Sequence, residues 1–170
     1  MISTTLLILQ IIAFLTYPPI LFSIITGRNV VYEMSKGNCE NVKDKVNDPK
    51  TQKDINKKCD ELMNVRIEIY LVMISFILSI ILYAIAIYFE ATNNKKLFKI
   101  FIFIGGIFSI LSLFVLFYII CSISNLVKEM EKLQKAPIDD INKYLWYMSI
   151  LPMVFTIITI ILVIINYFKK

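Results

Sequence analysis

The sequence predicts an all-α integral membrane protein: a four-helix (tetraspan) bundle in which two long helices protrude into a small disulfide-stapled head. Three observations predict this fold. Hydrophobic residues make up 58% of the 170 residues and charged residues only 18%, against about 45–50% and about 25% in soluble domains. Four long stretches carry no charged side chain, and two cysteines lie in the one long polar loop. Such a chain cannot hide its apolar surface in one water-soluble core.

Each of the four uncharged stretches is long enough to cross a bilayer. They are residues 1–27, 69–89, 100–127 and 144–168. About 20 apolar residues span the hydrocarbon layer as a helix. Helices are favoured over a barrel because each stretch is continuously apolar rather than alternating. We therefore expect one membrane domain, 1–170, with spans at about residues 2–26, 69–89, 98–126 and 144–168.

The first span contains a proline pair, Pro18 and Pro19. Prolines remove helical hydrogen bonds, so we expect a kink near the exit of this span. No Lys or Arg precedes the stretch, and it is longer than the apolar core of a signal peptide. We therefore expect it to remain as a span.

The connections predict the orientation. The short basic turn, 90–99, and the tail carry five lysines against the single acid Glu90: Lys95, Lys96, Lys99, Lys169 and Lys170. Basic residues favour the cytosolic side, so we expect both termini in the cytosol. The polar loop, 27–68, and the connection, 128–143, then lie on the non-cytosolic side. The sequence leaves open whether the membrane is that of the cell, an endomembrane or a virus.

The polar loop contains Cys39 and Cys59, which are 20 residues apart and not in a C-x-x-C motif. A pair so placed favours a disulfide in an oxidising compartment, which agrees with a non-cytosolic loop. The alternative is two unrelated buried thiols. Cys121 lies in the third span, where we interpret it as a packing residue.

The loop also carries helix signals. Asp48 and Pro49 form a typical helix start, and neither Pro nor Gly follows until Gly105. We expect one helix from Pro49 through Phe89, about 60 Å long, whose first half protrudes from the bilayer. The third helix is expected to protrude beside it, and the segment before Asp48 to be irregular. The alternative is a flexible charged linker.

Small or weakly polar residues recur at heptad-like spacing within the spans. In membranes such residues let helices pack closely. We expect these to form the internal packing face of the bundle: Ser75, Ser79, Gly105, Ser109, Ser112, Ser149, Thr156, Thr159 and Asn166. The alternative is that these stripes line a water path in an oligomer.

Several kinds of chemistry have no residues to support them. The sequence contains no histidine, no P-loop, no G-x-G-x-x-G motif and no charged residue inside a span. We therefore expect neither catalysis, nor a cofactor, nor a metal site, and no charge-coupled transport. The net charge of +5 is spread over loops of mixed sign, which does not suit nucleic acid.

We accordingly expect a non-catalytic structural or assembly component that lies in the lipid bilayer and anchors a larger complex. Two settings fit: an accessory subunit of a membrane complex, and a virion membrane protein under a capsid. The expected contacts with a protein partner are charged residues of the head: Asp54, Lys57, Lys58, Asp60, Glu61, Glu129 and Lys132. The alternative is a small oligomeric pore lined by the Ser/Thr/Asn stripes, and a homo-oligomer is compatible with either.

Overall fold

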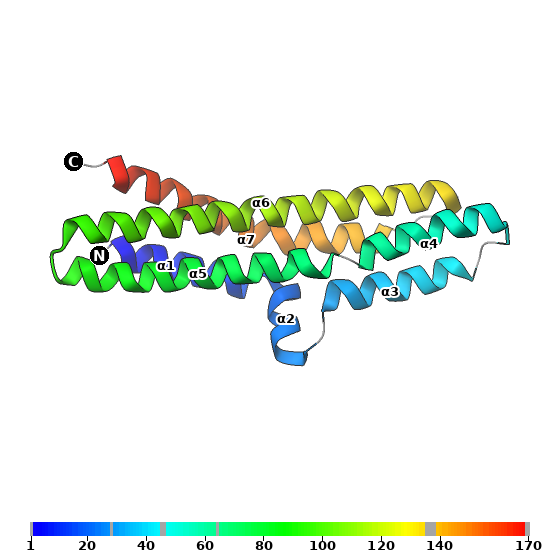
Figure 1. The fold of residues 1–170 in the computed structure, drawn as a ribbon, viewed down its shortest axis with the longest axis horizontal. Coiled ribbons are helices and arrows are strands. Elements are labelled where there is room, and N and C mark those ends of the chain that lie inside the picture. Colours follow the sequence, from blue (N-terminus) through cyan, green and yellow to red (C-terminus); the bar gives the residue numbers. More distant parts are fainter. Residues whose placement is uncertain (1, 28, 45–46, 64, 135–138, 169–170) are drawn as a thin grey trace.

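The computed structural model describes residues 2–27, 29–44, 47–63, 65–134 and 139–168, and the regular structure within these ranges is entirely helical. The helices are α1 (Ile2–Leu15), α2 (Pro18–Thr26), α3 (Val30–Lys43), α4 (Pro49–Met63), α5 (Arg66–Ala91), α6 (Lys95–Gln134) and α7 (Asp139–Phe168). Figure 1 shows an elongated bundle in which α5, α6 and α7 run along the long axis. Helices α3 and α4 form the head at one end.

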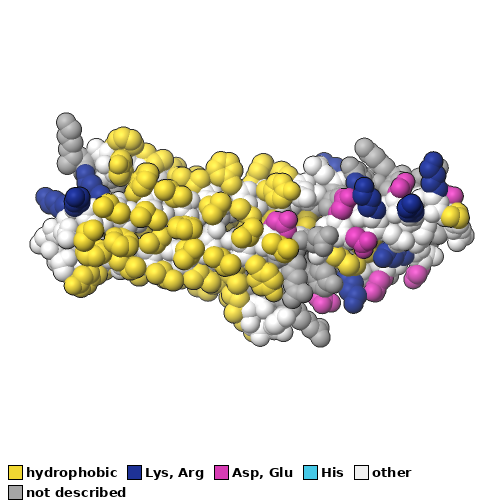
Figure 2. All heavy atoms as spheres, in the orientation of Figure 1, with side chains coloured by type: hydrophobic (Ala, Val, Ile, Leu, Met, Phe, Trp, Pro, Cys, Tyr) yellow, Lys and Arg dark blue, Asp and Glu magenta, His cyan; other side chains and the backbone are white. Residues whose placement is uncertain are grey.

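Three helices are long and apolar enough to cross a membrane: Ile67–Ala91 in α5, Lys95–Asn125 in α6 and Trp146–Phe168 in α7. They correspond to the second, third and fourth expected spans. Figure 2 shows that hydrophobic side chains cover this part of the surface, whereas charged side chains gather at its two ends. This pattern is typical of a protein whose middle faces lipid.

The first apolar stretch differs from the single kinked span that we expected. Helix α1 has 14 residues, about 21 Å at 1.5 Å per residue, and is therefore shorter than the hydrocarbon layer. Helix α2 is separate and points across the bundle axis (Figure 1). Between them Tyr17 leaves the helical conformation with φ −96° and ψ 80°. The proline pair explains this break. Pro18 and Pro19 have no N–H that could continue the hydrogen bonds of α1. They occupy the first turn of α2, where a missing N–H costs no helical hydrogen bond.

The start of α1 is held against the end of α5. The Glu90 carboxylate accepts hydrogen bonds from the backbone N–H of Ile2 (3.1 Å) and of Ser3 (3.3 Å), and from the Ser3 hydroxyl. A carboxylate at a helix N-terminus satisfies donors that have no partner within the helix. The start of α1 and the α5–α6 turn therefore lie at the same end of the bundle, and α7 ends there as well (Figure 1).

The single helix that we expected from Pro49 to Phe89 is instead two helices, α4 and α5. Along α5 a buried stripe recurs at spacings of four and three, with Ser75 buried beside it: Ile69, Val72, Phe76, Ser79, Tyr83 and Ala86. Val65, which lies just before α5, is buried in the same core as Ile55, Cys59 and Ile69.

The prediction of an irregular segment before Asp48 is also wrong, because α3 is a helix that includes Gly37 and Cys39. Gly and Asn lower helix propensity by up to about 1 kcal/mol each. Packing overrides that preference here, since α3 lies antiparallel to α4 and buries Cys39 completely.

The third expected span belongs to a helix that is longer than its apolar segment. Helix α6 has 40 residues, about 60 Å, and continues past the apolar segment that ends at Asn125. In the head it packs against α4. The α6 helix thus runs unbroken from the lysine turn to the head.

Candidate functional site

The head has a small apolar centre. Cys39 of α3 and Ile55 and Cys59 of α4 are all fully buried. The sulfur atoms of the two cysteines lie at disulfide distance, and their Cα atoms are 5.6 Å apart, close to the usual value of about 5.5–6 Å. Cys121 is a free, half-buried thiol in α6.

This centre belongs to a larger core that continues into the bundle. The same cluster contains residues from α1, α5 and α6: Ala13, Val65, Ile69, Val72, Phe76, Leu116, Ile119, Ile120, Ile123 and Val127. Tyr17, at the α1–α2 break, is part of it as well. The head is therefore packed onto the membrane helices through continuous apolar contact, rather than joined to them by a polar linker.

The outer face of α4 is charged. Three of the expected partner-contacting residues are exposed there: Asp54, Lys57 and Asp60. Lys58 and Glu61 form an ion pair with 3.6 Å between Nζ and Oε2, and their side chains are 28% and 42% exposed. An exposed pair of this kind adds at most about 1 kcal/mol to stability, so these charges mainly shape the surface. Glu129 and Lys132 belong to α6, but their side chains lie outside the described part of the chain.

The start of α4 is capped as the sequence predicted. Oδ2 of Asp48 accepts hydrogen bonds from the hydroxyl and from the backbone N–H of Thr51, the latter at 2.9 Å. Hydrogen bonding to the ionised form, the hydroxyl contributing most, lowers the pKa of the Asp48 carboxyl below its ordinary value. This cap fixes where the charged helix begins.

The expected helix-packing residues lie on the inner faces of the bundle. Those that are buried are Ser75, Ser79, Gly105, Ser109, Ser112, Ser149, Thr156 and Thr159. Asn166 is half-buried. In the described part of α7, the buried residues follow the same four-and-three spacing as in α5.

Most hydroxyls among these helix-packing residues donate to a carbonyl of their own helix. Ser75 donates to Leu71 O (2.8 Å). In α7, the Thr156 hydroxyl donates to Pro152 O (2.7 Å), and the Thr159 hydroxyl donates to Phe155 O (2.9 Å). A bond between helices joins the Tyr83 hydroxyl on α5 and Ser109 Oγ on α6, 3.0 Å apart. The small side chains therefore serve mainly close approach, since few of their hydrogen bonds cross between helices.

Two adjacent glycines bring α6 close to both of its neighbours. A Cβ atom on Gly105 would lie 2.7 Å from Cε1 of Tyr83, and one on Gly106 would lie 2.8 Å from Cγ1 of Val163. Real Cβ atoms almost never approach other atoms so closely. Gly105 thus makes room for α5, and Gly106 for α7.

Sequence reasoning missed the polar groups at the α1 face. Gln10 and Tyr17 are fully buried, and neither the Gln10 amide nor the Tyr17 hydroxyl has a hydrogen-bond partner among the described residues. A buried polar group left unpaired costs about 1–3 kcal/mol. The signal was present, because Ser3, Leu6, Gln10, Ala13 and Tyr17 follow the spacing of a buried stripe.

Among the described residues, no group of three or more Cys, Asp or Glu side chains is placed to hold a metal ion. Comparisons with protein families, with curated proteins and with solved structures give no match to this chain. The function must therefore be argued from the chain's own residues.

Proposed function

We propose that this protein is a non-catalytic, multi-pass membrane protein that anchors a larger complex through its charged head. The complex is either a membrane assembly that uses it as an accessory subunit or a capsid that covers a viral membrane. The observation that carries the proposal is the shared core, in which Cys39 and Cys59 belong to the same cluster as Phe76 and Leu116. A head packed in this way holds a partner at a defined height and orientation above the bilayer.

In this proposal α1 and α2 together form the fourth membrane element. Helix α1 packs against α5 and α7, and α2 turns aside with Ile24 and Ile25 50% and 73% exposed. Exposed isoleucines on a helix that leaves the bundle suit the boundary between lipid and water. The lysines at the opposite end favour cytosolic termini and a head on the non-cytosolic side.

The Cys39–Cys59 bond acts as the staple of the head in that oxidising compartment. Closing a loop of about 20 residues stabilises the fold by about 3 kcal/mol in the chain-entropy model. Small structures that bury few side chains commonly need such a cross-link, and the described side chains of α3 and α4 that are fully buried are Cys39, Ile55 and Cys59.

The charges on α4 supply the specificity of docking. Asp54, Lys57 and Asp60 present both signs on one exposed face. Charged contacts set register and orientation more than raw affinity. Binding therefore weakens as salt rises, because exposed charges are screened over about 8–10 Å at physiological ionic strength.

The pore alternative has less support. Ser109, Thr156 and Thr159 would have to face a water path, but each is at most 1% exposed within a single protomer. Their hydroxyls already donate to carbonyls of their own helices. An oligomer assembled from this bundle would present its isoleucine-rich outer faces to neighbouring copies, rather than these residues.

The test is co-purification from the native membrane in mild detergent, followed by mass spectrometry of the bound proteins. We expect a stoichiometric partner that is lost from the triple variant Asp54→Asn, Asp60→Asn, Glu61→Gln while membrane insertion is unchanged. The matched control removes two exposed acids of α3 and the exposed acid that follows it: Glu33→Gln, Glu40→Gln and Asp44→Asn. A pure homo-oligomer with bilayer conductance would contradict the proposal, and so would equal partner loss from both variants.

A further inference from the structure

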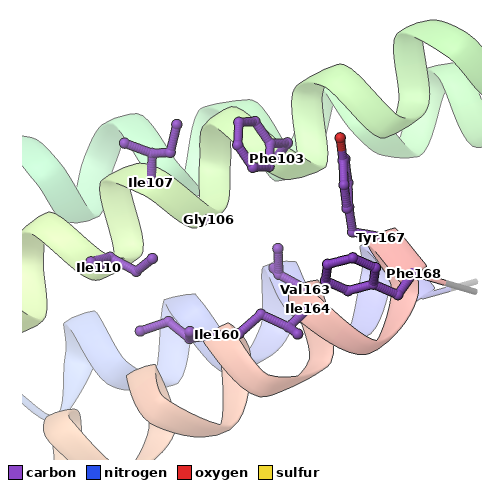
Figure 3. Close-up of a pocket in the computed structure, with 9 residues that line it drawn as sticks. All are labelled: Phe103, Gly106, Ile107, Ile110, Ile160, Val163, Ile164, Tyr167 and Phe168. Carbon is purple, nitrogen blue, oxygen red and sulfur yellow. The ribbon is translucent and has the colours of Figure 1, made fainter.

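An apolar groove opens on the outer surface between α6 and α7 (Figure 3). Gly106 and Val163 meet at its floor. Its walls are the isoleucines at 107 and 110 on α6 and at 160 and 164 on α7. The groove encloses about 150 Å³. These walls are apolar, so the groove suits a hydrocarbon chain better than water.

The groove leads toward two ammonium groups. Phe103 and Tyr167 stand at its end with ring centroids 5.2 Å apart. The same two side chains also line a neighbouring hollow of about 460 Å³, whose other walls are Lys96, Lys99 and Ile100. No carboxylate of the described residues pairs with either lysine. The apolar groove and the basic hollow are therefore neighbours that share the side chains of Phe103 and Tyr167.

The dimensions match one leaflet of a bilayer. Ile110 follows Lys99 by eleven positions on α6, a rise of about 16 Å. Half of the hydrocarbon thickness is about 15 Å. With Lys99 at the level of the headgroups, the groove reaches to the middle of the membrane. Tyr167 then lies at the interface, where an amphipathic ring is favoured.

We propose that this groove binds one anionic phospholipid. Its phosphate lies between Lys96 and Lys99, and one acyl chain lies along the α6–α7 groove. Hydrocarbon is the occupant available at this depth, because the groove runs through segments apolar enough to span the membrane. The lysines supply the charge complementarity, as in other basic pockets beside transmembrane helices that hold anionic headgroups. The site lies at the end of the bundle opposite the head and does not depend on the proposed docking function.

The test uses the full-length protein in nanodiscs that contain equal amounts of phosphatidylglycerol and phosphatidylcholine with identical acyl chains. Native mass spectrometry of the released protein counts the lipids that stay bound. We expect one retained phosphatidylglycerol, and at least about tenfold less retention in Lys96→Gln/Lys99→Gln, since each lysine near the surface is worth about a factor of five. The matched control, Lys95→Gln/Lys128→Gln, removes the same charge elsewhere and should retain the lipid.

A second variant tests the acyl chain. Ile164→Trp fills the groove but leaves the lysines, so it should also lose the lipid, and inorganic phosphate should not compete in the wild type. Retention of both lipids in equal amounts would overturn the proposal, as would equal loss from the control variant. A dimer in which a second copy covers Ile107 and Ile164 would likewise overturn it, because the groove would then be a protein interface.

Discussion

The bundle and the head solve the same packing problem in different solvents. In the bundle, Gly105 and Gly106 let helices touch, and hydroxyls such as that of Thr156 are satisfied within their own helix. Lipid then covers the isoleucine-rich outer faces. The head carries charged residues on its surface, and its fully buried side chains among those described are Cys39, Ile55 and Cys59, which share one core with the bundle. The difference teaches that close approach is the main device within the bundle, whereas the head draws on the core of the helices to which it is attached.

The largest expected effect is loss of the staple. Cys39→Ser/Cys59→Ser should destabilise the head by about 3 kcal/mol, so that protease cleaves α3 and α4 while the bundle stays intact. Cys121→Ser is the control, because this thiol lies in α6 outside the head. Limited proteolysis in detergent, followed over increasing urea, measures the difference.

Thiol labelling tests the premise of that experiment. Unreduced, denatured protein should label at one cysteine, Cys121. Labelling at all three cysteines would mean that Cys39 and Cys59 are separate thiols, and it would also remove the support that they give to a non-cytosolic head.

The second effect probes close approach in the bundle. Gly105→Ala and Gly106→Ala should each cost about 1–3 kcal/mol, because the added methyl group forces Tyr83 or Val163 to move. Gly37→Ala is the matched control in the head, where nothing lies within 4 Å of the new Cβ. It should be neutral or stabilise α3 by up to about 1 kcal/mol. Thermal unfolding in detergent compares the three variants, and equal values for Gly105→Ala and Gly37→Ala would contradict tight packing.

Much of this comparison can be predicted from the sequence. The spacing of residues such as Ser75, Ser109 and Thr159 indicated which faces turn inward, and Asp48 with Pro49 indicated where α4 begins. These signals are local, since a heptad or a cap is read within a few residues. They identify an apolar face before its partner is known.

Other features could not be predicted, because they depend on contacts between distant segments. Helix α3 forms despite Gly37 because α4 lies against it. The break before Arg66 has no local signal of this kind, because neither Pro nor Gly follows Pro49 until Gly105. The pairing of Glu90 with Ile2 and Ser3 joins residues more than 80 positions apart.

The third effect is smaller and concerns the hydrogen bond between helices. Tyr83→Phe removes the contact with Ser109 Oγ. We expect the free energy of unfolding to fall by about 0.6 kcal/mol, the average contribution of such hydrogen bonds in a membrane protein. The control is Tyr88→Phe, whose side chain is 64% exposed. A loss as large as that caused by Gly105→Ala would mean that polar bonds, rather than close packing, hold the bundle together.

The smallest effect is a pH dependence at the start of α4. The pKa of Asp48 is lowered from its ordinary value of 3.8 in the folded state. The cap therefore stabilises α4 at neutral pH, and this contribution is lost as the pH falls below 3.8 and through the lowered folded value. Backbone NMR of the α4 N-terminus should show fraying in that range. Asp48→Asn keeps an acceptor without titrating, so its N-terminus should not change with pH there.

Hydrogen exchange of α4 tests the central claim most directly, because the claim is that the head is an ordered continuation of the bundle. The protein is measured in nanodiscs without reducing agent, and the amides from Asn56 to Met63 are compared with those of α5. We predict exchange far slower than that of a random coil, and faster exchange in α4 than in α5 once the cysteines are reduced. Free exchange from Asn56 to Met63 in the unreduced protein would contradict the account and make the polar segment a tether.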